Sequence, residues 1–273
     1  MILDASDPQT REQVVEQAAQ VVRDGRVIVL PTDTVYGVGA DAFDQVAVAM
    51  VLAAKHRGRE MPPPVLVPST RTVDGLATEV PMYAKILIRQ FWPGALTIIV
   101  RAQTSLAWDL GETNGTVALR MPDDLLTLQV LTEVGPMAVT SANVTGQPPA
   151  TTAQEAQDQL GGAVALYLDG GPRTDSLAST IVDCTGEEPV VLRHGAIPAE
   201  RLREVLGVTV LHDAPPGVGD DADAVEEVAA VASSGGTRLV TTTDPLAVSG
   251  IRGSGVSVRA GDLRSVRAPD SLQ

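Results

Sequence analysis

Short apolar segments alternate with amphipathic segments along the first 207 residues, and this alternation is the feature that most limits the fold. Segments rich in Val, Ile and Leu are typical of buried strands, whereas apolar residues three or four positions apart are typical of helices. Several expected strands follow one another with no helix between them, which is typical of a mixed sheet. The sequence therefore predicts an α/β fold in which helices flank a mixed sheet.

The alternation assigns each expected element to a residue range. Strands are expected at 26–31, 64–68, 95–102, 116–122, 136–143, 163–171, 179–185 and 189–195. Helices are expected at 10–25, 44–55, 83–92, 125–134, 152–160 and 198–207. Asp7 and Pro8 are expected to start the first helix, because Asp caps free amides and Pro fits the first turn. The segment "TDTVYGVGADA" (32–42) is expected to be a loop.

The composition changes after about residue 208, and three parts of the chain are therefore expected. Residues 1–208 form the α/β domain, 209–224 form a linker rich in Pro, Gly and Asp, and 225–273 form a small tail. A tail of about 50 residues is marginal for an independent hydrophobic core. We expect it to be a βαβ-like appendage or to be partly ordered.

Acidic residues outnumber basic ones by 34 to 20, which gives a net charge of −14 and an isoelectric point near 4.5. This balance argues against broad, sequence-independent nucleic-acid binding, because such binding depends on neutralising many phosphates. A small local basic pocket is still compatible with it.

Cysteine, histidine and hydropathy exclude further classes of protein. The one cysteine, Cys184, cannot form an intramolecular disulfide, and the three histidines lack zinc-ligand spacing. The N-terminus lacks the regions of a signal peptide, and no apolar run approaches the roughly 18 residues that span a bilayer. We therefore expect a soluble cytoplasmic protein with no membrane contact and no protein-held metal.

A basic run stands out in this acidic chain, since "AAKHRGR" places Lys55, His56, Arg57 and Arg59 within five positions. The run is either a solvated loop or a cradle for an anion such as a nucleotide. The chain has no G-x-x-x-x-G-K-[ST], no third glycine after "GVG" and no G-x-S-x-G. An anion site would therefore be built from strand ends and side chains.

Three further polar stretches, at 31–40, 139–143 and 169–183, lie next to expected strands. Each of them alone is explained as well by a turn or a surface loop. Arg120 and Arg193 also fall near strand ends, and α/β proteins usually bind ligands at the carboxyl ends of strands. Hydroxyls, Asn, Lys and several Arg gathered there would suit an anionic ligand.

Six segments recur in the order found in a known family: "LPTDTVYGVGADA", the K-x-R of "AAKHR", "FWPGALT", "GTVALRMP", "SAN" and "STIVD". In these segments, over about residues 8–207, the chain resembles the threonylcarbamoyl-AMP synthases, the proteins with a YrdC-type domain. The resemblance implies a twisted open mixed sheet with flanking helices around a deep concave cavity. The small C-terminal appendage lies outside it.

The resemblance also implies an activity. An enzyme of this family, a nucleotidyltransferase, converts L-threonine, bicarbonate (or CO2) and ATP into threonylcarbamoyl-AMP and pyrophosphate, and Mg²⁺ is expected with the ATP. The product supplies the threonylcarbamoyl group for the modification of an adenosine in tRNA. A downstream tRNA threonylcarbamoyl-transfer complex is therefore expected as a partner, with weak or absent direct tRNA binding.

Matching motif positions carries the family's site residues onto this chain. The implied catalytic residues are Lys55 and Arg57. The implied threonine-binding residues are Thr34, Arg120, Val139 (through its backbone) and Ser179. The implied ATP-binding residues are Arg57, Thr116, Ser141, Asn143 and Arg193. Their cations would offset the repulsion between a carbamate and a triphosphate.

Three positions depart from the family, since Met61, Leu66 and Pro149 stand where polar residues are common. These three residues are left out of the expected site. The alternative function is an RNA-binding or ribosome-assembly factor that uses the concave face of the same fold. The net charge weighs against that alternative.

Overall fold

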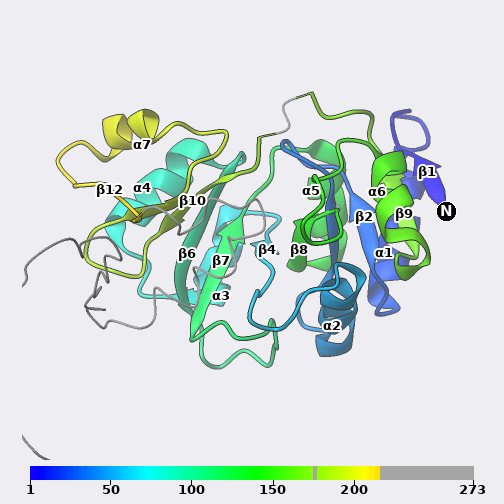
Figure 1. Cartoon of the computed structure of the whole chain (residues 1–273), viewed down its shortest axis with the longest axis horizontal. Coiled ribbons are helices and arrows are strands. Elements are labelled where there is room, and N and C mark those ends of the chain that lie inside the picture. The colour runs from blue at the N-terminus through cyan, green and yellow to red at the C-terminus, as the bar shows by residue number, and fades with distance from the viewer. Residues whose placement is uncertain (175–176, 216–273) are drawn as a thin grey trace, which may run out of the picture. The chain divides into compact units, whose positions relative to one another are not determined.

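The computed structural model describes residues 1–174 and 177–215, and the strands of this part belong to one mixed sheet (Figure 1). The strands are β1 (Ile2–Asp4), β2 (Ile28–Leu30), β3 (Gly37–Asp41), β4 (Val65–Leu66), β5 (Ala77–Thr78), β6 (Leu96–Ala102), β7 (Thr116–Arg120), β8 (Met137–Ser141), β9 (Leu166–Asp169), β10 (Thr180–Asp183), β11 (Val190–Arg193) and β12 (His212–Asp213). The helices are α1 (Arg11–Arg23), α2 (Gln45–Ala54), α3 (Val73–Leu76), α4 (Met82–Phe91), α5 (Leu125–Val134), α6 (Ala153–Leu160) and α7 (Ala199–Leu206).

The strand order across the sheet is β1-β9-β2-β3-β8-β4-β7-β6-β10-β11-β12, and β5 pairs with β6. The pairs β1–β9, β2–β9, β4–β7, β6–β10 and β11–β12 are parallel. The pairs β2–β3, β3–β8, β4–β8, β5–β6, β6–β7 and β10–β11 are antiparallel. The predicted α/β class with a mixed sheet is thus confirmed.

Helices cover both faces of the sheet. Side chains of α1 and α5 share one apolar cluster with Ile28 and Met137, whereas those of α2 and α6 share another with Val29 and Val38. Because successive strand residues point to opposite faces, these two helix pairs lie on opposite faces. α4 and α7 cover β6, β7 and β10 in a third cluster. No helix in the described part of the chain is long and apolar enough to cross a membrane.

The predicted strands and helices are all present, with ends that shift by no more than three residues, and they are confirmed. Two details are wrong. Residues 37–41, expected within a loop, form β3 between β2 and β8. Asp7 does not cap α1, because the helix begins at Arg11 after a turn in which the Asp7 carbonyl accepts the Thr10 N–H at 3.2 Å. The short elements β1, β5, β12 and α3 were not predicted.

Two glycines explain why β3 was hidden, since glycine is depleted in strands. A Cβ at Gly39 would lie 2.5 Å from Val139 Cγ2 and 2.6 Å from the Ala138 carbonyl oxygen. A Cβ at Gly37 would lie 2.6 Å from Val139 Cγ1. The glycines of "YGVGAD" therefore let β3 approach β8 closely, and the Val139 side chain fills the space that they leave.

The sheet continues past the expected boundary at residue 208. Leu211 is 7% exposed and packs into the apolar cluster under α4 and α7. β12 pairs with β11, and His212 Nε2 lies 2.6 Å from Glu188 Oε2. Residues 216–273, which hold most of the expected linker and all of the expected tail, lie outside the described residues.

Candidate active site

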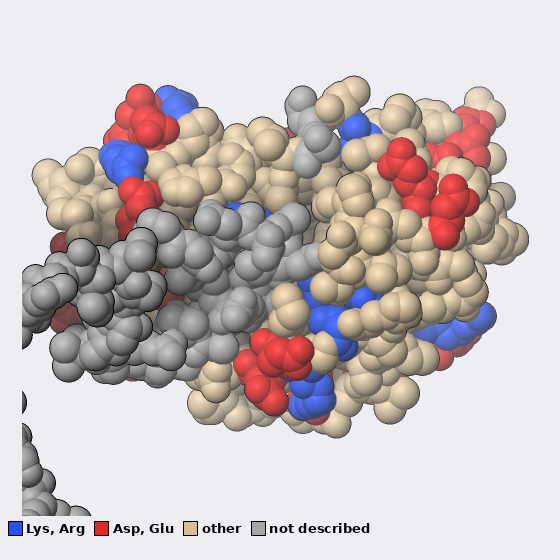
Figure 2. Space-filling view, viewed as in Figure 1, with Lys and Arg blue, Asp and Glu red and all other residues tan. Residues whose placement is uncertain are grey.

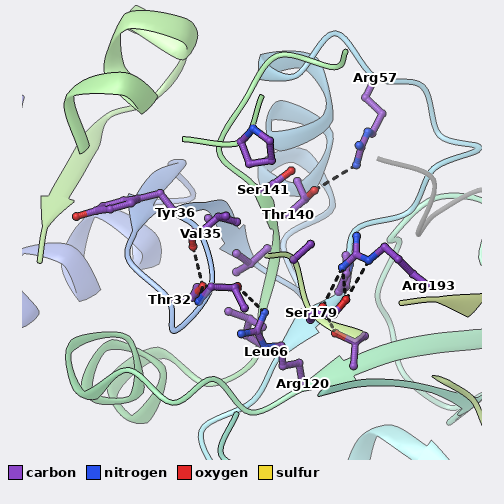
Figure 3. Close-up of a pocket in the computed structure, with 17 residues that line it drawn as sticks. Thr32, Val35, Tyr36, Arg57, Leu66, Arg120, Thr140, Ser141, Ser179 and Arg193 are labelled. Carbon is purple, nitrogen blue, oxygen red and sulfur yellow. Dashed lines mark hydrogen bonds between the residues drawn. The ribbon is translucent and has the colours of Figure 1, made fainter. Parts of the chain in front are cut away.

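A pocket lies where strands from distant parts of the sequence end side by side (Figure 3). Its lining residues are Thr32, Thr34, Val35, Tyr36, Gly37, Arg57, Pro64, Leu66, Thr97, Arg120, Val139, Thr140, Ser141, Pro149, Ala178, Ser179 and Arg193. They come from the turn after β2, the ends of β7, β8 and β11, the start of β6 and the residues before β10, among other segments. Within the described part of the chain, this lining holds three arginines and no carboxylate. Such a pocket suits an anionic ligand.

Arg120 is the last residue of β7, and its buried side chain is held by three bonds. Nε donates to the Gly94 carbonyl (3.0 Å), Nη1 donates to the Thr34 hydroxyl (3.1 Å), and Nη2 pairs with Asp33 Oδ1 (2.6 Å). Burial lowers the pKa of the Arg120 guanidinium, and the Asp33 carboxylate opposes that shift. A guanidinium has five N–H groups, so these bonds leave two of them to meet a carboxylate in the pocket.

The turn after β2 is closed by its own side chains. The Thr32 hydroxyl donates to the Val35 carbonyl (2.6 Å) and accepts the Thr34 backbone N–H (3.1 Å). It also lies 3.0 Å from the Thr34 hydroxyl, which Arg120 contacts from the other side. The Thr34 hydroxyl is therefore fixed in place before any ligand binds.

Arg193 and Ser179 meet because β10 and β11 pair in antiparallel fashion. Arg193 donates to the Ser179 carbonyl from Nε (3.0 Å) and Nη2 (2.8 Å), and to the Ser179 hydroxyl from Nη2 (3.0 Å). The Ser179 hydroxyl also lies 2.9 Å from the hydroxyl of Thr97, the second residue of β6. Thr97 ends the quoted segment "FWPGALT" but was not predicted as a site residue, because its hydroxyl lies in the apolar strand pattern "ALTIIV".

The basic run after α2 forms a tight helix end with two backbone hydrogen bonds. The His56 N–H donates to the Ala53 carbonyl at 3.0 Å. The Arg57 N–H donates to the Leu52 carbonyl, also at 3.0 Å, and His56 adopts a left-handed φ of 56°. This turn buries Lys55 and Arg57 and leaves His56 exposed. The solvated-loop interpretation is therefore wrong for these two cations.

Lys55 is completely buried behind the pocket wall. Its Nζ donates to the Ser141 carbonyl at 2.6 Å and lies 3.3 Å from the Ser141 hydroxyl. It also donates to the Asn143 carbonyl (2.9 Å) and to Asn143 Oδ1 (3.1 Å). Lys55 is not among the lining residues. It fixes the "SAN" turn at the end of β8, which presents Ser141 to the pocket.

Arg57 and Arg120 lie on opposite sides of the pocket, and Arg193 approaches from a third direction (Figure 3). Arg57 is 7% exposed, and its Nη1 donates to the Thr140 hydroxyl at 3.2 Å. The three guanidinium groups thus surround the same space. An elongated ligand with two anionic ends would match this arrangement.

Two residues that the resemblance assigned to the nucleotide, Asn143 and Thr116, do not line the pocket. The Asn143 amide is used within its own loop and by Lys55. Thr116 starts β7, whereas Arg120 ends it, so at about 3.3 Å per residue the two lie about 13 Å apart. The Thr116 hydroxyl donates to the Thr113 carbonyl at 2.8 Å and lines a separate small cavity.

The three residues that depart from the family pattern lie in different places relative to the pocket. Leu66 and Pro149 line the pocket, whereas Met61 does not. Leu66 is 4% exposed and pairs with Arg120 across β4 and β7, so it gives the pocket an apolar wall beside that arginine. Arg59 forms an ion pair of 2.7 Å with Asp109 at the surface and does not line the pocket.

The described residues do not fit a protein-held metal. No three His, Cys, Asp or Glu side chains in residues 1–174 and 177–215 lie close enough together to hold one. The pocket lining consists of arginines, hydroxyls and apolar groups, and cations repel a metal ion.

Residues 20–195 match the protein family described as telomere recombination, whose name combines Sua5, YciO and YrdC. The match covers more than half of the chain. The chain belongs to this family.

Relatives within the Sua5/YciO/YrdC family extend over most of the described residues. The chain is 53% identical over 205 residues to a relative from Mycobacterium tuberculosis (strain CDC 1551 / Oshkosh), which is 75% of this chain and 94% of the relative. It is 38% identical over 208 residues to threonylcarbamoyl-AMP synthase of Bacillus subtilis (strain 168), which is 75% of this chain and 58% of that protein. Its structure resembles that of P. abyssi Sua5 complexed with L-threonine, with a TM-score of 0.71 and 32% identity over 78% of this chain and 62% of that one.

Proposed function

We propose that the chain is an L-threonylcarbamoyl-AMP synthase, an enzyme that converts L-threonine, bicarbonate (or CO2) and ATP into threonylcarbamoyl-AMP and pyrophosphate. The observation that carries this proposal is the pocket in which Arg57, Arg120 and Arg193 surround one space lined by hydroxyls. The name of the Bacillus subtilis relative and the L-threonine complex of P. abyssi Sua5 support it.

Threonine binds beside Arg120 in this proposal. The two N–H groups that Arg120 has left would hold the threonine carboxylate bidentately, a geometry that guanidinium groups favour. The Asp33 ion pair fixes the plane of the guanidinium. The Thr34 and Ser179 hydroxyls and the Val139 backbone then surround the amino acid.

ATP occupies the side of the pocket formed by Arg57 and Arg193. The planar guanidinium group of arginine matches phosphate oxygens well. The Ser141 hydroxyl adds a hydrogen-bond donor at the end of β8. We leave Thr116 out of the proposed contacts because it lines another cavity. Mg²⁺ is proposed to arrive bound to the ATP phosphates, where it neutralises part of their charge.

The proposed reaction forms two bonds. The threonine amine attacks the carbon of CO2 and loses a proton, which gives a carbamate. A carbamate oxygen then attacks the α-phosphorus of ATP, and the bond to the oxygen that bridges the α- and β-phosphorus breaks, so pyrophosphate leaves with that electron pair. Arg57 and Arg193 stabilise the negative charge on the phosphoryl oxygens. Because the adenylyl group is transferred, the enzyme is classed as a nucleotidyltransferase.

Lys55 acts through its neighbours in this proposal and is a positioning residue. Its ammonium group fixes the backbone and side chain of Ser141 and Asn143. The Ser141 hydroxyl is thereby held at the pocket surface. Arg57, two residues further along the chain, makes the direct contact with ATP.

The product would be a mixed anhydride of a carbamate and a phosphate, which is an activated carbamoyl donor. An acceptor reaction must therefore consume it, and we propose a tRNA threonylcarbamoyl-transfer complex of the cytoplasm as the downstream partner. Direct binding of tRNA is not required for the synthase step. On the coloured part of the face shown in Figure 2, Lys and Arg form small groups beside acidic residues, which does not favour the RNA-binding alternative.

The proposal is tested by measuring pyrophosphate release and threonylcarbamoyl-AMP by mass spectrometry. We expect both products only when threonine, bicarbonate and ATP are all present. The parallel arm measures RNA binding at low and high salt, since binding through phosphates falls steeply with salt. Tight RNA binding together with no synthesis would overturn the proposal in favour of the alternative.

A further inference from the structure

Thr97 is a buried pocket residue to which the proposed reaction gives no role. It is 2% exposed, it lines the pocket, and it lies at the start of β6, the strand between β7, which ends at Arg120, and β10, which follows Ser179. Its hydroxyl lies 2.9 Å from the Ser179 hydroxyl, which is its hydrogen-bond partner within the described residues.

The hydrogen bonds around Ser179 limit where its single proton can go. A hydroxyl donates one hydrogen bond and accepts two, whereas a guanidinium only donates. Arg193 Nη2, at 3.0 Å, therefore fills one acceptor position of the Ser179 hydroxyl. The direction of the hydrogen bond with Thr97 then decides whether the Ser179 proton is free for a ligand, because either hydroxyl can be the donor of that bond.

One of these two orientations suits the proposed ligand. If Thr97 donates to Ser179, both acceptor positions of Ser179 are filled and its proton is directed to a third group. Ser179 lines the pocket, where a threonine carboxylate would accept that proton. The reverse orientation would use the Ser179 proton on Thr97 and leave Ser179 without a donor for the ligand.

We propose that Thr97 is a positioning residue for L-threonine: its hydroxyl donates to Ser179 and turns the Ser179 proton toward the amino acid. This inference rests on the proposed function. Thr97 affects the binding of threonine and much less that of ATP. Arg193, the proposed ATP contact, is held in addition by the Ser179 carbonyl at 3.0 and 2.8 Å. Those bonds do not depend on the Thr97 hydroxyl.

Thr97→Val is the suitable substitution because it keeps the branched shape of the side chain and replaces only the hydroxyl. Thr97 pairs with Ile181 inside the sheet, where valine is also favoured. Thr97→Ser restores the hydroxyl and serves as the matched control. Thr97→Ala provides a second variant without the hydroxyl if the valine variant does not fold, as judged by its thermal unfolding.

The experiment measures KM for threonine, KM for ATP and kcat by pyrophosphate release in the full chain. We expect Thr97→Val to raise the threonine KM by about tenfold, as for the loss of one oriented hydrogen bond, and to change the ATP KM by less than about twofold. Thr97→Ser should stay within about threefold of the wild type. Calorimetric titration with threonine alone should show the same loss of affinity without turnover.

The decisive comparison uses Ser179→Ala. If Thr97 acts only through Ser179, then adding Thr97→Val to Ser179→Ala raises the threonine KM no further. A further increase would show that Thr97 touches threonine itself and would overturn the positioning role, as would a Thr97→Val enzyme with the wild-type threonine KM. A wild-type chain that forms no threonylcarbamoyl-AMP would instead refute the proposed function, so the two failures are distinguishable.

Discussion

Replacing Lys55 by methionine tests whether its ammonium group supports the site from behind. Four oxygen atoms of Ser141 and Asn143 lie 2.6–3.3 Å from Nζ, and three protons are available to bond them. Lys55→Met removes these bonds while it retains an unbranched side chain of similar length. The buried carbonyl and amide oxygens then lose their charged donor.

The expected loss of stability in Lys55→Met is the balance of two opposing effects. Each buried acceptor left without a donor costs about 1–3 kcal/mol, and relief from burying an ammonium group offsets part of the sum. We expect a net loss of about 3 kcal/mol, which is about 6–12 °C in Tm for a domain of roughly 200 residues. The same change should lower turnover, because the Ser141 hydroxyl loses its support.

Lys85 is the only other lysine of the chain and supplies the matched control. It lies exposed on α4, so Lys85→Met should change stability by less than about 0.5 kcal/mol and leave turnover unchanged. Thermal and urea unfolding of both variants are the measurements. Equal stability of the Lys55→Met and Lys85→Met proteins would refute the buried hydrogen-bond network.

Three further predictions concern Arg120, His56 and Cys184. Arg120→Ala should raise the threonine KM by at least about 100-fold, because two charge-assisted hydrogen bonds of about 1.5–3 kcal/mol each are lost, and an equal rise in the ATP KM would contradict the assignment. His56→Gly should raise the free energy of unfolding by about 1 kcal/mol and His56→Val should lower it, because His56 has a left-handed φ of 56° that glycine adopts at no steric penalty. A urea midpoint for His56→Gly that is no higher than that of His56→Val would disprove the strain. Burial raises the pKa of the Cys184 thiol, so this group's contribution to stability is full below the unfolded pKa near 8.5 and decreases as pH rises above it. Urea midpoints at pH 7.5 and 9.5 should therefore fall more steeply for the wild type than for Cys184→Ala, and parallel slopes would argue against a buried neutral thiol.

Most of the fold was predictable because it depends on patterns that a sequence displays directly. Buried strands such as 26–31 and amphipathic helices such as 10–25 are apolar at regular intervals. β3 was missed because Gly37 and Gly39 carry no side chain to show a strand pattern, and its pairing with β8 is a tertiary contact. β12 was missed because two residues are too few to show any period.

The site was predictable in composition more than in arrangement. Seven of the ten residues that the resemblance assigned line the pocket, and Lys55, Thr116 and Asn143 do not. Motif matching places a residue in a segment and does not say which end of a strand faces the ligand, which is why Thr116 was assigned to ATP in the same site where Arg120 was assigned to threonine. Thr97 ends the family segment "FWPGALT" but was given no role, because its contact with Ser179 depends on the pairing of β6 with β10.

The two glycines of β3 differ in how they constrain the chain over evolutionary time. A side chain at position 37 would collide with Val139 Cγ1 alone at short range, since the Thr140 carbonyl oxygen is 3.5 Å away. Loss of Gly37 could therefore be compensated by a smaller residue at position 139, and the two positions form an epistatic pair. Position 39 has no such partner, because the Ala138 carbonyl oxygen lies 2.6 Å from the added atom and no substitution removes a backbone carbonyl. Since Val139 is also a wall of the pocket, any exchange at position 37 would alter the ligand site at the same time.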